Sequence, residues 1–313
     1  MPNIVPYRSD ADLPNIYQSY DFKGYSLSIN GSLIDVTNIT VSSDEEFYAI
    51  FKLVDDVRNI VHDDWFVYSD LTKFTENSYP GFENSSYSIS GYYISLKPEL
   101  LVQGKVVLPR THNGQPIIGY MNNGDPNKAT NQLITHVFIS NSDEDCKLTV
   151  IAGSSFDGIS TLKYFEFERT SLRVIDSWAF RGCSIDADTL NLQDCPLRYI
   201  GNYAFNQGIS SPGPCTIILP SSLKVVNNGG FNYLNNCLGT ISFEIGNADV
   251  LSDLDFSVNN SGDNYKKFWQ NETSPLNITF YSKLYDSSMD IIPGSNITVA
   301  DVFGENVESI SVY

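Results

Sequence analysis

The side chains in this 313-residue sequence that could do chemistry are mainly acidic, with 37 Asp and Glu against five cysteines and three histidines. Two carboxyl groups about 5 to 10 Å apart could hydrolyse a glycosidic bond, but no motif here fixes such a pair across a cleft. The sequence also has no Gly-x-Ser-x-Gly turn, no phosphate-binding glycine loop and no His-Glu-x-x-His segment. We therefore expect no catalytic residue and no cofactor.

Potential metal ligands are equally dispersed. The three histidines lie far apart and no Cys-x-x-Cys pair occurs, so we expect no zinc site. The acidic runs 141–145 and 253–255 lack the ligand spacing and turn glycine of an EF-hand, and the run 62–64 is interpreted as solvated side chains. The odd number of cysteines favours free, buried thiols that act as small apolar core residues; they are Cys146, Cys183, Cys195, Cys215 and Cys237.

One motif is written four times in the middle of the chain. Each copy has two apolar residues, then a short polar or small stretch, and then a phenylalanine. These phenylalanines follow one another at intervals of 24, 25 and 26 residues and are Phe156, Phe180, Phe205 and Phe231. A period in the twenties indicates a solenoid, in which each unit buries its apolar face only by stacking on its neighbours. We call these four side chains the plug phenylalanines.

A short alternating run precedes the motif in each unit, at 165–167, 190–192, 216–218 and 241–243. Alternation with a period of two predicts a strand with one buried face. Inward leucines follow at Leu172, Leu197 and Leu223. Each unit is thus predicted to contain a strand, an inward leucine, and a helical or turn segment that carries the plug phenylalanine.

The runs 178–183, 200–205 and 218–223 together resemble BspA-like leucine-rich repeats, whose units read as strand, Ile-Pro, Ile-Gly, Ala-Phe and Cys. The runs 104–109 and 113–119 resemble the opening coil of such arrays. The resemblance covers residues 90 to 245 and implies a right-handed leucine-rich-repeat solenoid over 98–245. Arrays of this family are known mainly as surface adhesins, so it also implies binding to protein or glycan.

The segments before the repeats predict a small α+β domain over 21–97, preceded by an extended arm over 1–20. Asn30-Gly31 between two alternating runs predicts a hairpin. Ser43 and Glu46 form a capping box that predicts a helix, whose apolar stripe would run from Phe47 to Val61. Strands are expected at 65–68 and 87–96. The arm, rich in proline and tyrosine, is expected to take a fixed path only against other structural subunits, which it would bind. A loosely ordered terminus is the alternative.

Beyond the repeats, residues 246–313 are predicted to form a β-rich cap and tail, because the end of a solenoid exposes an apolar edge. A strand is expected at 276–281, followed by a polar tail that ends at 309–313. The fold class predicted for the whole chain is α+β, with the small domain first, the solenoid next and the cap last.

Within the predicted strands, Phe165 and Phe167, Leu190 and Leu192, Ile218, and Ile241 and Phe243 should point inward. The positions between and beyond them should face solvent. They are polar and acidic with an aromatic at one end, which suits sugar hydroxyls or a basic protein patch. An ordinary solvated face is the alternative. This candidate ligand-binding row, the outer ribbon, comprises Tyr164, Glu166, Glu168, Asn191, Gln193, Ser242 and Glu244.

The net charge of −18 argues against nucleic acid as a partner, because phosphate is bound by clustered Lys and Arg. No apolar run approaches eighteen residues, so no membrane span is expected, and the first eight residues lack the pattern of a secretory signal. These features predict a non-catalytic structural and recognition protein, with a repeat head on an attachment domain. We expect a bacteriophage virion component that contacts the host; the alternative is an extracellular or cell-surface adhesin of a bacterium or parasite.

Overall fold

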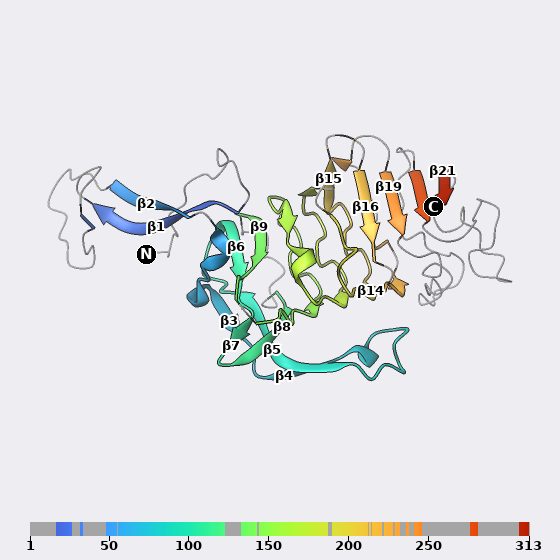
Figure 1. Ribbon diagram of the computed structural model, residues 1–313, viewed down its shortest axis with the longest axis horizontal. Coiled ribbons are helices and arrows are strands. Elements are labelled where there is room, and N and C mark those ends of the chain that lie inside the picture. Colours follow the sequence, from blue (N-terminus) through green and yellow to red (C-terminus); the bar gives the residue numbers. More distant parts are fainter. Residues whose placement is uncertain are drawn as a thin grey trace.

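Two or three short parallel strands per coil wind the repeats into a β-solenoid (Figure 1). The structure is a computed structural model and describes residues 17–26, 32–33, 48–54, 56–122, 133–142, 144–186, 190–211, 213, 215–220, 222–227, 229–231, 236–237, 241–245, 276–280 and 307–312. Helix in these residues is limited to single 3-10 turns at Val57–Asn59 (η2), Asp63–Trp65 (η3), Glu76–Ser78 (η4) and Phe167–Arg169 (η6).

The apolar pair that opens each motif copy is a two-residue strand, and the plug phenylalanine that follows it lies in a turn, as predicted. Val150 pairs in parallel with Val174, which pairs with Tyr199, which pairs with Val225. Branched and aromatic side chains suit such a packed, pleated surface. The four strands are β10 (Val150–Ile151), β12 (Val174–Ile175), β14 (Tyr199–Ile200) and β17 (Val225–Val226).

The sheet formed by these strands extends toward the N-terminus in the order β17-β14-β12-β10-β8-β5-β3. Residues before and after the boundary predicted at residue 97 therefore share one sheet and one hydrophobic core. The strands expected at 65–68 and 87–96 are present. The added elements are β3 (Phe66–Tyr68), β4 (Thr72–Thr75), β5 (Ser88–Leu96), β7 (Thr111–His112) and β8 (Gln115–Tyr120).

A second parallel series follows the predicted alternating runs and carries the outer ribbon. The bridge between Asn191 and Ile218 connects the run 190–192 to the next coil. A third, shorter parallel series, called the bordering series, lies between residues 185 and 237 of the sequence. Its strands are β6 (Gln103–Leu108), β9 (Leu133–Ile139), β11 (Tyr164–Phe165), β16 (Cys215–Leu219), β19 (Ile241–Ile245), β20 (Leu276–Phe280) and β21 (Val307–Val312), with β13 (Ile185–Asp186), β15 (Ile209–Ser211) and β18 (Asn236–Cys237) in the bordering series.

The plug phenylalanines form a continuous row in the core, as predicted. All four are buried, and their rings stack with centroids 5.2, 5.2 and 5.1 Å apart in succession. Leu172, Leu197 and Leu223 are fully buried beside them. Gly201 permits the close spacing of the coils, because a Cβ there would lie 2.4 Å from the backbone nitrogen of Ser177.

The helix predicted from the capping box at Ser43 and Glu46 was wrong in its described part. Residues Tyr48–Val54 form strand β2, which pairs antiparallel with β1 (Ser19–Ser26). The run Tyr-Ala-Ile-Phe-Lys-Leu-Val is rich in residues that favour strands, and a pairing partner about thirty residues earlier overrides its helical spacing. The capping box, the Asn30-Gly31 hairpin and most of the arm lie outside the described residues.

The end of the predicted arm contacts its own chain. The backbone N–H of Val57 donates to the carbonyl of Tyr17 at 2.7 Å, and the Tyr17 ring lies 5.4 Å from that of Phe138. The expectation that residues 1–20 find a fixed path only on another subunit was therefore wrong for this end. Residues 1–16 lie outside the described part of the chain.

At the other end of the chain, β19, β20 and β21 continue the second sheet in parallel. The strand expected at 276–281 is present as β20. The segment expected to be a polar tail contains β21, whose Ile310 pairs with Ile278. Residues 246–275 and 281–306, which make up most of the predicted cap, lie outside the described residues.

Candidate functional site

The outer ribbon is divided into a covered part and an exposed part. Glu168, Asn191 and Gln193 are exposed, as predicted. Tyr164 and Glu166 are buried, with 7% and 0% of their surfaces exposed, so the prediction that they face solvent was wrong. Ser242 and Glu244 lie in β19, but their side chains are outside the described part of the structure.

The register of β16 differs by one residue from the sequence-based assignment. Ile217 and Leu219 are the buried residues of this strand, while Ile218 is only half-buried. The prediction that Ile218 points inward was therefore wrong. Thr216 was left out of the outer ribbon on that basis, yet its side chain is exposed. The signal was present in the sequence, because Leu219 continues the same alternation as Ile217. We use the name exposed ribbon for Glu168, Asn191, Gln193 and Thr216.

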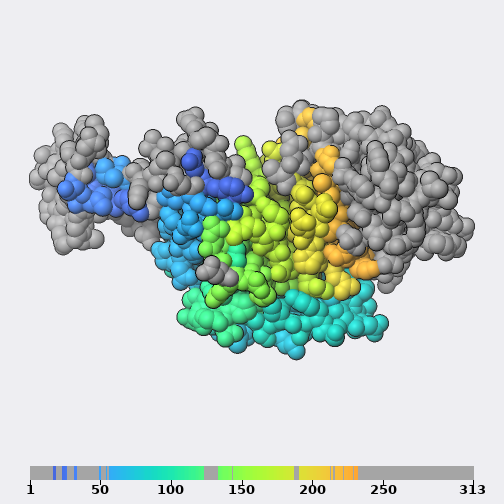
Figure 2. Space-filling model, in the orientation of Figure 1, coloured from blue at the N-terminus to red at the C-terminus, as the bar shows by residue number. Residues whose placement is uncertain are grey.

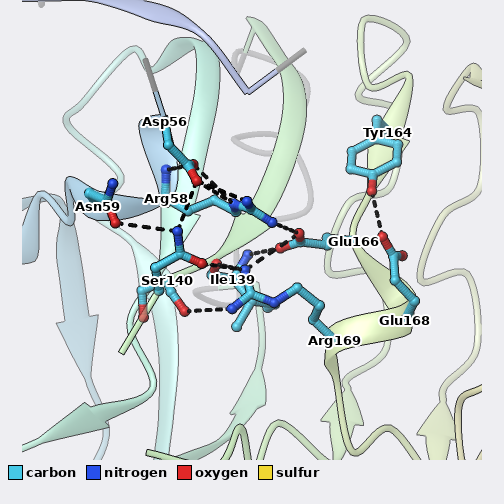
Figure 3. Close-up of polar contacts among 10 residues, drawn as sticks. Asp56, Arg58, Asn59, Ile139, Ser140, Tyr164, Glu166, Glu168 and Arg169 are labelled. Carbon is cyan, nitrogen blue, oxygen red and sulfur yellow. Dashed lines mark hydrogen bonds and ion pairs between the residues drawn. The ribbon is translucent and has the colours of Figure 1, made fainter. Parts of the chain in front are cut away.

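Segments that precede the repeats cover the first part of the ribbon (Figure 3). Glu166 accepts hydrogen bonds from Nη1 of Arg58 at 3.0 Å and from the backbone N–H of Ile139 at 2.7 Å. The guanidinium of Arg169 lies 3.6 Å from the same carboxylate. Arg58 comes from η2, 108 residues earlier in the chain. The buried acid therefore joins the N-terminal region to the solenoid.

Around this acid, a network of charged groups continues toward the surface. Arg58 donates to Asp56 through Nε at 3.0 Å and Nη2 at 2.8 Å, and Asn141 bridges Asp56 to Arg169 through contacts of 2.9 and 2.8 Å. Burial raises the pKa of Glu166 despite its cationic neighbours, whereas the hydrogen bond from Arg58 lowers that of Asp56. This satisfied arrangement is typical of a structural ion-pair cluster.

The neighbouring tyrosine is also held in place. The hydroxyl of Tyr164 donates to Glu168 at 2.8 Å, and its ring packs 5.5 Å from Phe138. The Arg58 guanidinium lies 4.0 Å above the ring of Tyr17. These contacts explain why the ribbon becomes accessible only at Glu168 and the coils that follow.

A second covering element lies on the sheet of two-residue strands. The hairpin formed by β4, η4 and β5 runs along one side of the repeats (Figure 2). Its Phe74 and Phe82 pack with Val150, Val174, Tyr199 and Val225 in one hydrophobic cluster. Each of these four residues comes from a different coil, so the hairpin packs on four successive coils. We call it the clasp.

Glu76 fixes the clasp on two successive coils. Its carboxylate accepts hydrogen bonds from Arg173 at 2.9 Å and Arg198 at 3.0 Å, and only 1% of its surface is exposed. The two guanidinium groups also lie over aromatic rings of the clasp, those of Tyr87 and Phe82. The ion pairs keep the pKa of Glu76 below its ordinary value, although burial acts in the opposite direction.

A polar cavity of about 380 Å³ opens beside the Glu166 cluster. It lies between residues 58–63, 109–111 and 140–142. Asp63 is the only acidic residue among the described residues of its lining, whereas glycoside hydrolysis uses two carboxyl groups.

Within the described residues, no group of three His, Cys, Asp or Glu side chains is placed to hold a metal ion. Cys146, Cys183 and Cys195 are free thiols, and the latter two are buried. Burial raises the pKa of Cys195 to about 12, so this thiol stays protonated and unreactive at neutral pH. No helix in the described part of the chain has the length and apolar character of a membrane span.

The stacked coils, inward leucines and plug row define a leucine-rich-repeat solenoid, a class that is typically a non-catalytic binding scaffold. Residues 131–259 match the family described as BspA type Leucine rich repeat region, in six copies. This match confirms the resemblance to BspA-like leucine-rich repeats that the sequence motifs predicted for this part of the chain. Searches among the curated proteins and the solved structures find no match.

Proposed function

We propose that this protein is a non-catalytic recognition protein that binds its partner on the exposed ribbon. The supporting observation is the uneven covering of the coils. The clasp covers the sheet of two-residue strands, and the N-terminal region covers Tyr164 and Glu166, while Glu168, Asn191, Gln193 and Thr216 remain exposed. These side chains offer hydroxyl, amide and carboxylate groups on a rigid surface, and rigid placement reduces the entropic cost of binding.

The separation of a covered N-terminal region from a partly exposed solenoid favours a protein in which the first part attaches and the second part recognises a partner, rather than a free enzyme or carrier. The N-terminal region joins the solenoid through Glu166, Arg58 and the clasp, and in this proposal its first residues, 1–16, bind other structural subunits. A bacteriophage virion component that contacts a host surface protein or glycan fits this order of attachment region and head. The repeat family itself favours a second candidate, a bacterial or parasite cell-surface adhesin.

Fractionation of the native source distinguishes the two candidates. Virions purified on a density gradient, and the surface fraction of host cells, should be digested and assayed for peptides of this chain by quantitative mass spectrometry. The virion assignment predicts a constant number of copies per particle and none on uninfected cells. Peptides confined to the surface of uninfected cells would exclude the virion assignment and support the adhesin.

Deletion of residues 2–16 tests the attachment role separately. The contacts of Tyr17 with Val57 and Phe138 remain in this variant, so we expect its melting temperature to stay near that of the wild type. Incorporation into the native assembly should fall. Full incorporation of the deletion variant would assign attachment to another segment.

A further inference from the structure

Trp178 is a bulky aromatic residue held in a backbone conformation that normally favours glycine. Its φ is 59° and 43% of its surface is exposed. L-residues are disfavoured in this left-handed region, and such outliers gather at functional sites when the fold does not need the side chain. The core gains little from this ring, because it lies on the surface.

The position belongs to a series that the repeat creates two residues before each plug phenylalanine. Ser154, Trp178, Tyr203 and Gly229 occupy it in successive coils, with φ values of 56°, 59°, 55° and 66°. The left-handed turn is therefore a property of the coil, and the fourth coil fills it with the residue that is conformationally most suitable. The second and third coils instead carry two aromatic residues, so the side chain there is not dictated by the turn.

The backbone of Trp178 is fixed from both sides. Its N–H donates to the carbonyl of Asn202 in the next coil at 2.9 Å, and its own carbonyl accepts from the N–H of Arg181 at 3.2 Å. Asn202 adds a second unfavourable free-energy term at these turns, because its Oδ1 is buried without a hydrogen-bond partner. Such groups in native proteins call for an explanation.

A charged pair lies beside the ring. The guanidinium of Arg181 lies 5.4 Å from the ring centre and is itself paired with Asp157 of the preceding coil through bonds of 2.8 and 2.6 Å. The other large hydrophobic residues that are exposed in the described chain are Leu33, Val67, Leu71 and Leu133. All four precede the plug turns, so among the described plug turns Trp178 is the one exposed large hydrophobic residue, and the charged Arg181 lies beside it.

From these observations we propose that the edge at Trp178 binds a neutral sugar chain. A pyranose ring has one face of C–H groups, which packs on the aromatic face, and a rim of hydroxyls, which can bond to Arg181 and Asp157. A protein interface would require a larger apolar centre around the ring. Because Arg181 is already neutralised by Asp157 and the chain carries a net charge of −18, an anionic glycan is disfavoured.

The test compares Trp178→Gly with Ser154→Gly, the matched change at the same position one coil earlier. Isothermal titration calorimetry with cellohexaose, maltohexaose and chitohexaose measures affinity, and thermal unfolding measures stability. At least one hexasaccharide should bind the wild type and Ser154→Gly equally, and bind Trp178→Gly about tenfold or more weakly. The melting temperature of Trp178→Gly should stay unchanged or rise, because glycine relieves the left-handed conformation.

Three results would overturn the proposal: no saturable binding of any of the three sugars, equal binding by Trp178→Gly, or a marked loss of stability in that variant. The last would assign the ring a role in the fold. The double variant Asn191→Ala/Gln193→Ala should retain sugar binding, because it alters only the exposed ribbon. Loss of sugar binding there would move the site to the ribbon.

Discussion

The rings of Phe180 and Phe205 stack with centroids 5.2 Å apart and planes inclined by 7°. Neither side chain is exposed. Each ring comes from a different coil, and the stacking continues to Phe156 on one side and Phe231 on the other. The core of any one coil is therefore completed by its neighbours, which is the physical reason for the regular spacing in the sequence.

Phe180→Ala should lower the free energy of unfolding by about 3 to 5 kcal/mol, because it leaves a cavity within the stacked row. Urea denaturation followed by circular dichroism measures the loss. Lys163→Ala, a change at an exposed position of the same coil, serves as the control and should change stability by less than about 0.5 kcal/mol. A Phe180→Ala protein as stable as the wild type would disprove the role of the row.

Arg58→Ala should destabilise the protein more than Glu166→Gln. The first change leaves two carboxylates without their main cation, and breaking a buried ion pair from one side costs roughly 3 kcal/mol or more. The second keeps an acceptor for the N–H of Ile139 and removes a charge that burial already disfavours, as the raised pKa of Glu166 indicates. Chemical denaturation of both variants and of the double variant at pH 7 gives the coupling energy. The reverse order of stabilities would contradict the structural reading of this cluster.

Glu76→Ala should loosen the clasp without unfolding the solenoid. Arg173 and Arg198 would lose their common partner, and amide hydrogen exchange across residues 72–96 should accelerate while the plug turns stay protected. Glu83→Ala alters an exposed acid of the same hairpin and serves as the matched control. Equal exchange in the two variants would mean that apolar packing alone holds the clasp.

We expect the free energy of unfolding to fall on mild acidification because of His136. Burial, and to a smaller extent Lys105 and Lys163, lowers the pKa of His136 from 6.5 to about 4. Between these values the unfolded chain binds a proton that the folded chain does not, so stability falls as the pH decreases from 7 to 4. The contribution is at most on the order of 3 kcal/mol.

His136→Gln should remove this component. Thermal unfolding of both proteins across pH 4 to 7 isolates it, because the carboxylates of Asp56, Glu76 and Glu166 contribute equally to both curves. The difference between the two curves should change steadily over this interval. A constant difference would show that His136 titrates alike in the folded and unfolded states.

The repeat and its plug row were predictable because their signal is local and recurs in every coil. The strand register is harder to predict from sequence. In β16, Ile217 and Ile218 are adjacent apolar residues, so either could point inward, and only the apolar Leu219 shows that Ile217 does. The strand character of Tyr48–Val54 depends on pairing with Ser19–Ser26. Helical spacing and a capping box can therefore be outweighed by a partner that the local sequence does not reveal.

The covering of the ribbon could not be predicted from the repeats alone. Glu166 occupies an outward position by alternation, yet Arg58, 108 residues earlier, buries it. Glu76 and Arg198 are separated by 122 residues. Such contacts depend on how the N-terminal segments fold back over the coils, and no spacing in the sequence encodes that. Exposed positions farther along the ribbon, at Asn191 and Gln193, followed the simple rule because nothing in the described chain covers them.

Site-specific photo-crosslinking within the native assembly, or on native cells, tests most directly whether the exposed ribbon binds the partner. A benzophenone amino acid placed at Gln193 or at Thr216 is compared with the same residue at Glu99, an exposed position that precedes the family match at 131–259. Binding on the ribbon predicts one defined adduct from Gln193 and Thr216, with the crosslink mapped by mass spectrometry, and none from Glu99. Adducts from Glu99 alone, or equally from all three positions, would contradict it.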